Sequence, residues 1–254
     1  MVRVRILGVG MGPQHVTTEA AEALRSVDYV LAADKGDGSD DDGLLDLRRA
    51  IVADNAGPGG PAEVVALHDP PRDRSDRLTT AGYERAVSDW HAARAARYAR
   101  ILQQRGGTAA FLVWGDPSLY DSTIRIVERI RDLGMNVDYD VLPGISAPQL
   151  LAARHRIVLN EVGRPVHVTT GRRLQEAVAG GLDNIVAMLN PPPERLDLTG
   201  LDEWTIWWGA NLGATGERLV SGRLGDVFGS VVEARRAAKA ETGWVMDLFL
   251  VRKP

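Results

Sequence analysis

The chain has 254 residues, of which 44% are hydrophobic and 25% charged, and its formal net charge at pH 7 is −4. This composition is that of an ordinary globular protein with one large domain or two small ones, and the acidic balance argues against nucleic acid as the main partner. The absence of cysteine excludes disulfides, thiolate zinc sites and cysteine nucleophiles. Because neither a signal peptide nor an apolar run of ~20 residues is recognisable, no membrane association and a cytoplasmic location are expected.

The first part of the chain alternates between short apolar runs and helical patterns. Strands are expected at residues 2–9, 29–33, 108–114 and 137–141, and helices at 17–26, 80–104 and 122–133. The run at 108–114 is apolar throughout, which is typical of a strand buried on both faces of a sheet. The long helix at 80–104 has an aromatic-rich apolar face that Arg94 interrupts. This alternation predicts an N-terminal α/β domain, residues 1–154, with a mainly parallel sheet.

After Pro165 the pattern changes to strands with shorter connections. The expected strands are residues 165–170, 184–189, 204–208, 218–224 and 244–251. Several of the connections could be hairpins, so a second α/β domain with a mixed sheet is expected at residues 165–254. Strand alternation places Trp207 and Trp208 on opposite faces, which favours packing in a core or a dimer interface over stacking on one ligand.

Neither the acidic run nor the histidines of the chain form a metal motif. Residues 37–43 are rich in aspartate, but their spacing lacks the closing glutamate of a calcium loop, and a solvated turn is expected. No cluster of histidine and carboxylate side chains has metal-ligand spacing, so no metal is expected.

Three turns containing glycine and proline each follow an apolar run and precede a helical pattern. They are the sequence GVGMGP from Gly8, GDP from Gly115 and PGISA from Pro143. In open α/β sheets, ligands bind outside the carboxyl ends of the strands. Three such turns at one edge would form a site made mainly of backbone groups.

Each turn also has an alternative interpretation. The first turn has the pattern G-x-G-x-G followed by Pro13, whose nitrogen carries no hydrogen for the pyrophosphate of a dinucleotide. Asp34 after the second strand is nevertheless compatible with an NAD site. A purely structural turn is the other alternative. Asp116 can accept hydrogen bonds from backbone amides in an Asx-type turn or from hydroxyls of a ligand. Ser146 can cap a helix or donate to a ligand.

Taken together, the order and spacing of the three turns resemble those of the S-adenosylmethionine-dependent tetrapyrrole methylases, over nearly the whole chain. That family carries Gly-x-Gly-Pro-Gly, then Gly-Asp-Pro, then Pro-Gly-[Ile/Val]-[Ser/Thr]-[Ala/Ser]. The first turn departs from this form, because it reads GMGPQH from Gly10 where the family commonly has Gly-x-Gly-Pro-Gly-Asp. This departure bears on the subgroup within the family and not on the family itself. Four further stretches are similar to one branch, which methylates C-1 of precorrin-5 and releases acetate: YVLAADKG from Tyr29, HDPPRDR from His68, WGDPSLYD from Trp114 and GWVMD from Gly243.

The resemblance implies two α/β domains with S-adenosylmethionine in the cleft between them, a small-molecule tetrapyrrole substrate and a homodimer. By position, the cofactor-binding residues would be Trp114, Gly115, Asp116, Leu119, Ser146 and Ala147, with Met188 and Leu212 contributed by the second domain. Pro13 would border the tetrapyrrole. Arg72 and Arg74 would bind its carboxylates, which arginine forks suit.

Release of an acetyl group as acetate requires water to attack a carbonyl, and a general base helps that step. Asp34 is the first candidate for the base because it ends a strand that would face the cleft. His68 is the second, although a histidine between such residues can also be an ordinary loop residue. Other functions that stay open are another precorrin or uroporphyrinogen methylase, an NAD-dependent Rossmann oxidoreductase and a nucleotide-binding protein without catalytic activity.

Overall fold

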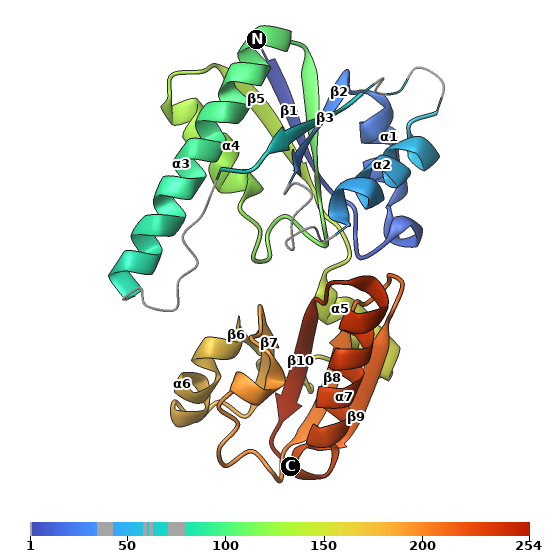
Figure 1. Cartoon of the computed structure of the whole chain (residues 1–254), viewed down its shortest axis with the longest axis vertical. Helices are drawn as coiled ribbons and strands as arrows, with labels where there is room; N and C mark the ends of the chain where they lie inside the picture. Colours follow the sequence, from blue (N-terminus) through green and yellow to red (C-terminus); the bar gives the residue numbers. More distant parts are fainter. Residues whose placement is uncertain (1, 35–42, 58–59, 61–62, 71–79) are drawn as a thin grey trace. The chain divides into compact units, whose positions relative to one another are not determined.

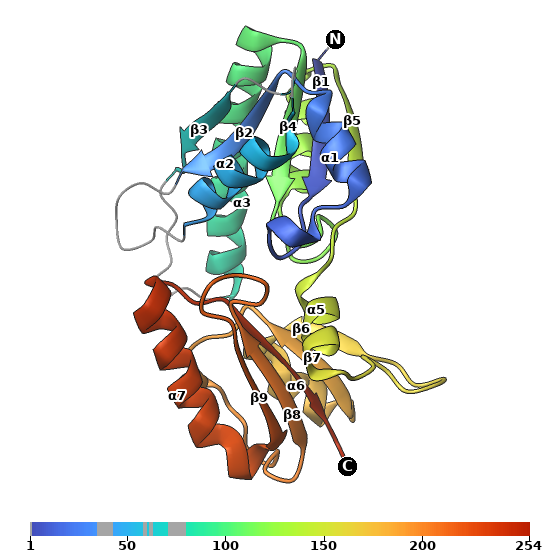
Figure 2. The same cartoon turned by 90° about the vertical axis from the view of Figure 1, so that its right-hand side faces the viewer.

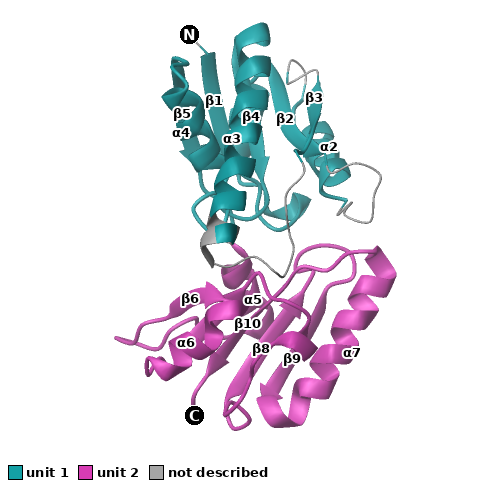
Figure 3. Cartoon of the chain, turned by 60° about the vertical axis from the view of Figure 1, so that its left-hand side comes forward, with its two compact units in different colours: residues 1–145 teal, residues 146–254 magenta. Residues whose placement is uncertain are grey.

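A computed structural model of the chain describes residues 2–34, 43–57, 60, 63–70 and 80–254. The chain forms two compact units, Met1–Ile145 and Ser146–Pro254, which are coloured separately in Figure 3. Each unit is an α/β structure with its own five-stranded sheet. Almost all of the acidic run 37–43 lies outside the described residues.

The sheet of the first unit is entirely parallel, as the alternating pattern predicts. Its order is β3-β2-β4-β1-β5, with strands β1 (Val2–Gly8), β2 (Tyr29–Asp34), β3 (Val64–His68), β4 (Thr108–Val113) and β5 (Val137–Leu142). Leu7 of β1 pairs in register with Leu112 of β4 and Leu142 of β5. The carboxyl ends of these three strands are therefore level, and the three glycine-containing turns leave the sheet at one edge.

Helices cover both faces of this sheet (Figures 1 and 2). They are α1 (Thr18–Arg25) and α2 (Leu44–Asn55) on one face, and α3 (Thr80–Arg105) and α4 (Thr123–Asp132) on the other. Along β4, Phe111 joins the core beneath α3 and α4, whereas Leu112 joins the core beneath α1 and α2. This alternation confirms that the continuous apolar run is a strand buried on both faces.

The sheet of the second unit is mixed, which confirms the sequence-based expectation. Its order is β6-β7-β10-β8-β9, with strands β6 (His167–Thr170), β7 (Asn184–Met188), β8 (Thr205–Ala210), β9 (Arg218–Arg223) and β10 (Asp247–Arg252). Only β6 and β7 pair in parallel, and the other neighbours are antiparallel. Its helices are α5 (Ala147–His155), α6 (Leu174–Ala179) and α7 (Leu224–Thr242).

The two faces of the second sheet are covered by different helices. Trp208 is buried in the core beneath α6 and α7, as expected of a packing tryptophan, and Trp204 is buried in the same core. On the opposite face α5 contacts β8 and β10, where a β-carbon added at Gly209 would meet Leu151. The division of the chain thus falls before α5, because that helix packs on the second sheet, whereas the boundary drawn from the sequence at 154–165 lies after it.

Candidate functional site

The three turns meet at the carboxyl edge of the first sheet. Gly10 and Gly115 form an isolated β-bridge in which each amide donates to the other's carbonyl, at 3.2 and 2.8 Å. The third turn packs against this bridge so closely that a β-carbon on Gly144 would overlap the Gly115 carbonyl oxygen and lie 2.8 Å from the carbonyl carbon of Gly8. Gly115 also has φ of +76°, which side chains disfavour. The expected convergence of backbone groups is therefore present within the first unit.

Asp116 links the second turn to the third. Its Oδ2 accepts from the Gly144 amide at 2.9 Å, and its Oδ1 accepts from the amide of Ser118 at 2.8 Å and from the Ser118 hydroxyl. Burial alone would raise the pKa of Asp116, but these hydrogen bonds outweigh it and hold the pKa below its ordinary value. Of the roughly four acceptor positions of a carboxylate, three are engaged by the chain itself.

Trp114 and Leu119 flank this linked turn, and both are half-buried. The indole Nε1 of Trp114 is buried and has no hydrogen-bond partner among the described residues. A buried donor of this kind is normally satisfied by water or a bound molecule. Tyr120, which follows Leu119, has φ of +53°, a left-handed conformation that is unusual outside glycine and recurs at ligand sites. Peptide groups, apolar side chains and an unsatisfied donor suit a folded nucleoside cofactor.

The remaining expected cofactor residues belong to the second unit. Ser146 occupies the N-cap position of α5, with its amide and its hydroxyl both 2.8 Å from the Gln149 side-chain oxygen, and Ala147 is the first residue of that helix. Met188 ends β7 and is half-buried, whereas Leu212 is only 1% exposed. Their neighbours Leu189 and Asn211 have φ of +52° and +49°, so both residues adjoin a strained backbone position.

The two candidate bases lie side by side. Asp34 at the end of β2 is the register partner of His68 at the end of β3, and the Asp34 carbonyl accepts from the amide of Asp69 at 2.8 Å. Asp34 is half-buried and His68 is exposed. The two residues were predicted independently of each other from the sequence, and the parallel pairing of β2 with β3 makes them neighbours.

The structure places only one of the three expected tetrapyrrole contacts. Pro13 is exposed in a short 3₁₀ helix, Pro13–His15, directly after the first turn. Arg72 and Arg74 lie outside the described residues. Two arginines of the second unit form ion pairs within that unit: Arg154 with Glu217 at 2.9 Å and Arg173 with Glu176 at 2.8 Å.

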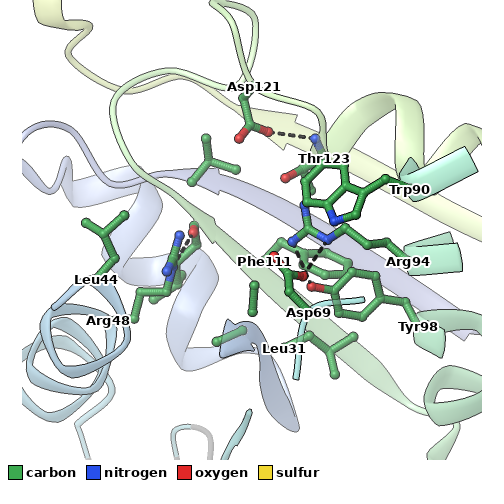
Figure 4. Close-up of a pocket in the computed structure, with 14 residues that line it drawn as sticks. Leu31, Leu44, Arg48, Asp69, Trp90, Arg94, Tyr98, Phe111, Asp121 and Thr123 are labelled. Atoms are coloured by element: carbon green, nitrogen blue, oxygen red, sulfur yellow. Dashed lines mark hydrogen bonds and ion pairs between the residues drawn. The ribbon is translucent and has the colours of Figure 1, made fainter. Parts of the chain in front are cut away.

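The first unit also contains a pocket of about 280 Å³ at the carboxyl end of β2 and β4. Figure 4 shows it between α2, which contributes Arg48, and α3, which contributes Trp90, Arg94 and Tyr98. Its further lining comes mainly from the strands: Leu31, Ala32, Ala33, Phe111, Leu112 and Val113, with Leu44, Asp69, Asp121 and Thr123. We call this the arginine pocket. None of its lining residues is among the sites nominated from the sequence.

Arg94, which breaks the apolar face of α3 in the sequence, is held firmly inside this pocket. Its Nε lies 2.9 Å from Asp69 Oδ1, its Nη2 donates to the Tyr98 hydroxyl at 3.1 Å, and its guanidinium carbon lies 4.6 Å from the Trp90 ring centroid. Only 15% of the Arg94 side chain is exposed. Burial raises the pKa of Tyr98, against the opposing effect of Arg94, so the phenol stays protonated. The one feature of the sequence that could have indicated this pocket is the charged Arg94 within the apolar face of α3.

Within the described ranges, no group of three or more histidine, aspartate or glutamate side chains could hold a metal ion. No helix in the same ranges is both long and apolar enough to cross a membrane.

Comparisons with a family model, a protein sequence and a solved structure agree with one another. Residues 3–227 match the family model of the Tetrapyrrole (Corrin/Porphyrin) Methylases. A "Precorrin-6A synthase [deacetylating]" from Sinorhizobium sp is 41% identical over 258 residues, which cover 100% of this chain and 96% of that protein. The crystal structure of a putative cobalamin synthesis related protein (CobF) from Corynebacterium diphtheriae is 36% identical, with a TM-score of 0.80 and 99% of both chains covered.

A more distant structure shows the shared fold alone. Uroporphyrin-III C-methyl transferase from Thermus thermophilus, complexed with S-adenyl homocysteine, is 19% identical and superposes with a TM-score of 0.59. The match covers 99% of this chain and 97% of that one.

Proposed function

The chain belongs to the tetrapyrrole (corrin/porphyrin) methylases, and we propose that it catalyses the precorrin-6A synthase reaction, in which C-1 of precorrin-5 is methylated and an acetyl group leaves as acetate. As a member of this family it is an S-adenosylmethionine-dependent methyltransferase of cobalamin biosynthesis. The family match selects this interpretation over an NAD-dependent oxidoreductase. The observation that carries the finer proposal is the full-length identity of 41% to a deacetylating precorrin-6A synthase.

The cofactor would be held around the linked turns. S-adenosylmethionine, when bound, supplies the electrophilic methyl group. Trp114, Gly115 and Leu119 would contact it directly, and the unsatisfied indole N–H of Trp114 supports this role. Asp116 would act mainly by fixing the turn that presents these groups, because its own acceptors are largely engaged. Ser146, Ala147, Met188 and Leu212 of the second unit complete the proposed cofactor set.

The acetyl group would be removed by water. A new bond forms between the water oxygen and the acetyl carbonyl carbon, the bond from that carbon to the macrocycle breaks, and its electron pair stays on the macrocycle. Asp34 is the proposed acceptor of the proton that the water loses, and the neighbouring His68 is the second candidate. Pro13 would border the macrocycle. Arg72 and Arg74 stay proposed carboxylate contacts.

The decisive experiment has two stages. Calorimetry with S-adenosylmethionine, S-adenosylhomocysteine and NAD should show micromolar binding of the two sulfur nucleotides and no binding of NAD. Incubation with precorrin-5 and S-adenosylmethionine should then release S-adenosylhomocysteine and acetate in equal amounts. Methylation without acetate would instead favour another precorrin or uroporphyrinogen methylase of the family. Binding of NAD alone would contradict the whole proposal.

The proposal extends to assembly and location. We expect a homodimer in the cytoplasm that acts without a metal cofactor. Sedimentation analysis of the purified protein would test the dimer, since a monomer at all concentrations would contradict it. Turnover that survives exhaustive chelation would support the absence of a metal requirement.

A further inference from the structure

The arginine pocket has no role in the reaction described so far. We propose that it binds one carboxylate-bearing side chain of the tetrapyrrole, and that Arg48 and Arg94 hold the carboxylate. This inference rests on the proposed function only in that the substrate is an acidic tetrapyrrole.

The size of the pocket sets what it can hold. Pockets that enclose a whole drug-sized ligand have roughly 300–1,000 Å³, and the arginine pocket has about 280 Å³. A complete macrocycle is therefore too large, whereas a flexible acid side chain fits easily. The pocket opens at the carboxyl ends of β2 and β4, the edge of the sheet where ligands of open α/β folds bind.

Arg94 is prepared for an anion by its surroundings. Its Nε forms an ion pair with Asp69, and its Nη2 donates a hydrogen bond to the Tyr98 hydroxyl, as Figure 4 shows. Its guanidinium also lies over the Trp90 ring. Its Nη1 has no partner among the described residues. Because the side chain is already immobilised, little rotamer entropy is lost when a carboxylate binds. Asp69 and Tyr98 thus position Arg94 and leave donors for a ligand.

Arg48 approaches the pocket from the opposite side. It reaches over from α2, and its Nε donates to the Leu112 carbonyl at 3.0 Å, near the carboxyl end of β4. This bond fixes the guanidinium beside the strand that forms the floor of the pocket (Figure 4). Two arginines that converge from different helices present a wide set of donors, which matches a carboxylate better than a single lysine-like charge would.

The two acidic side chains of the lining do not cancel this attraction. Asp69 is occupied with Arg94. Asp121 accepts from the Thr123 amide at 2.7 Å, at the start of α4. Each carboxylate thus already has a partner, and Arg94 keeps its Nη1 for an entering ligand. An entering carboxylate would gain charge-assisted hydrogen bonds in a partly desolvated site.

The test compares paired arginine variants in the full-length protein. Arg48→Gln and Arg94→Gln remove the proposed contacts, whereas Arg49→Gln and Arg100→Gln remove exposed arginines from the same two helices. Fluorescence titration with uroporphyrin III, a stable polycarboxylate tetrapyrrole, measures substrate-like binding. Calorimetry with S-adenosylhomocysteine and a melting curve report on the cofactor site and on folding.

We expect each pocket variant to bind uroporphyrin III at least tenfold more weakly, while the two control variants stay within twofold of the unaltered protein. S-adenosylhomocysteine affinity should be unchanged in all four. Equal weakening in pocket and control variants, unchanged binding in both pocket variants, or no binding by the unaltered protein would each overturn the inference. If Arg94→Gln fails to fold, Arg48→Gln decides alone, since it removes the second proposed contact from a different helix.

The proposed reaction is judged separately from the pocket. Acetate release from precorrin-5 by the unaltered protein tests the reaction, and the uroporphyrin III titration needs no turnover. Where turnover occurs, Arg48→Gln should raise KM for precorrin-5 at least tenfold with a smaller change in kcat. Unchanged KM would count against the pocket and leave the reaction intact.

Discussion

At the residue scale, Asp116 acts through the backbone around it. Its carboxylate accepts hydrogen bonds from the Gly144 amide in the third turn and from the amide and hydroxyl of Ser118 in its own turn. The charge therefore ties together two segments that are distant in the chain. A neutral amide at this position could accept with one atom only and would leave one of these donors without a partner.

We predict that Asp116→Asn lowers the free energy of unfolding by about 1 kcal/mol at pH 7, a modest value because the residue is only half-buried. The folded-state pKa of Asp116 lies below its ordinary value. The stability that it contributes is thus present above about pH 4 and is lost as the pH falls through the lower folded pKa. Urea unfolding at pH 7 and pH 3 should show the difference between variant and unaltered protein shrinking at low pH. The exposed Asp132→Asn serves as control, and a difference independent of pH would contradict the assignment.

Asp34 and His68 allow a second test at this scale, because the register of β2 and β3 makes them neighbours. We predict that Asp34→Asn reduces acetate release by roughly 10²–10⁴-fold, the usual contribution of a positioned base. His68→Gln should have a smaller effect, since that side chain is exposed. Quenched-flow assays of acetate, with S-adenosylhomocysteine affinity as the control, measure both. Full turnover by Asp34→Asn would eliminate it as the base.

Sequence reasoning at single residues succeeded where chemistry is local. The N-cap role of Ser146 follows from its place before a helix, and the Asx-type role of Asp116 follows from its place between glycine and proline. Arg94 could not be interpreted in the same way. Its partner Asp69 belongs to another part of the chain, and only the packing of α3 beside the end of β3 makes the two an ion pair.

At the element scale, strands and helices with strong patterns were predictable and weaker ones were not. The strand at Thr108–Val113 and the helix at Thr80–Arg105 appear where their apolar patterns indicate. Four elements had no prediction: α2, β3, α6 and α7. The edge strand β3 is short and only half-buried, so it carries no continuous apolar run. Helix α2 has Gly43 at its N-cap, which offers no side-chain cap, and α7 contains two glycines in its first turns.

The glycines of α7 lead to a prediction about that helix. A β-carbon added at Gly229 meets open space, whereas one at Gly225 would lie 3.3 Å from Asp202. Alanine restricts the unfolded chain and favours helix, so Gly229→Ala should raise the free energy of unfolding by about 0.5–1 kcal/mol. Gly225→Ala should give a smaller gain or a loss, because Asp202 would have to move. Urea unfolding of both variants is the measurement, and equal effects would show that space around the helix does not matter.

At the scale of the whole molecule, the family could be identified because three individually weak turns occur in a fixed order. Each turn alone is compatible with a structural role, and Gly144 shows why they are related: a β-carbon there would overlap the Gly115 carbonyl oxygen, and a β-carbon on Gly8 would lie 2.5 Å from the Gly144 nitrogen. A constraint shared by three separate segments is a stronger signal than any one of them. The positions of Met188 and Leu212 beside strained residues could not be inferred, since backbone φ values depend on the folded chain.

The same mutual fit leads to a prediction for the molecule as a whole. A ligand present at one hundred times its dissociation constant stabilises the folded protein by about 2.7 kcal/mol, which for a chain of this size corresponds to a rise in Tm of roughly 5–10 °C. S-adenosylhomocysteine should produce this rise and NAD none.

In Gly144→Ala the new methyl group must displace the Gly10–Gly115 bridge, so both the Tm and the ligand-induced rise should fall. Gly229→Ala makes the same chemical change away from the turns and should keep the full rise. A full rise in Gly144→Ala would mean that the cofactor does not depend on the junction of the three turns.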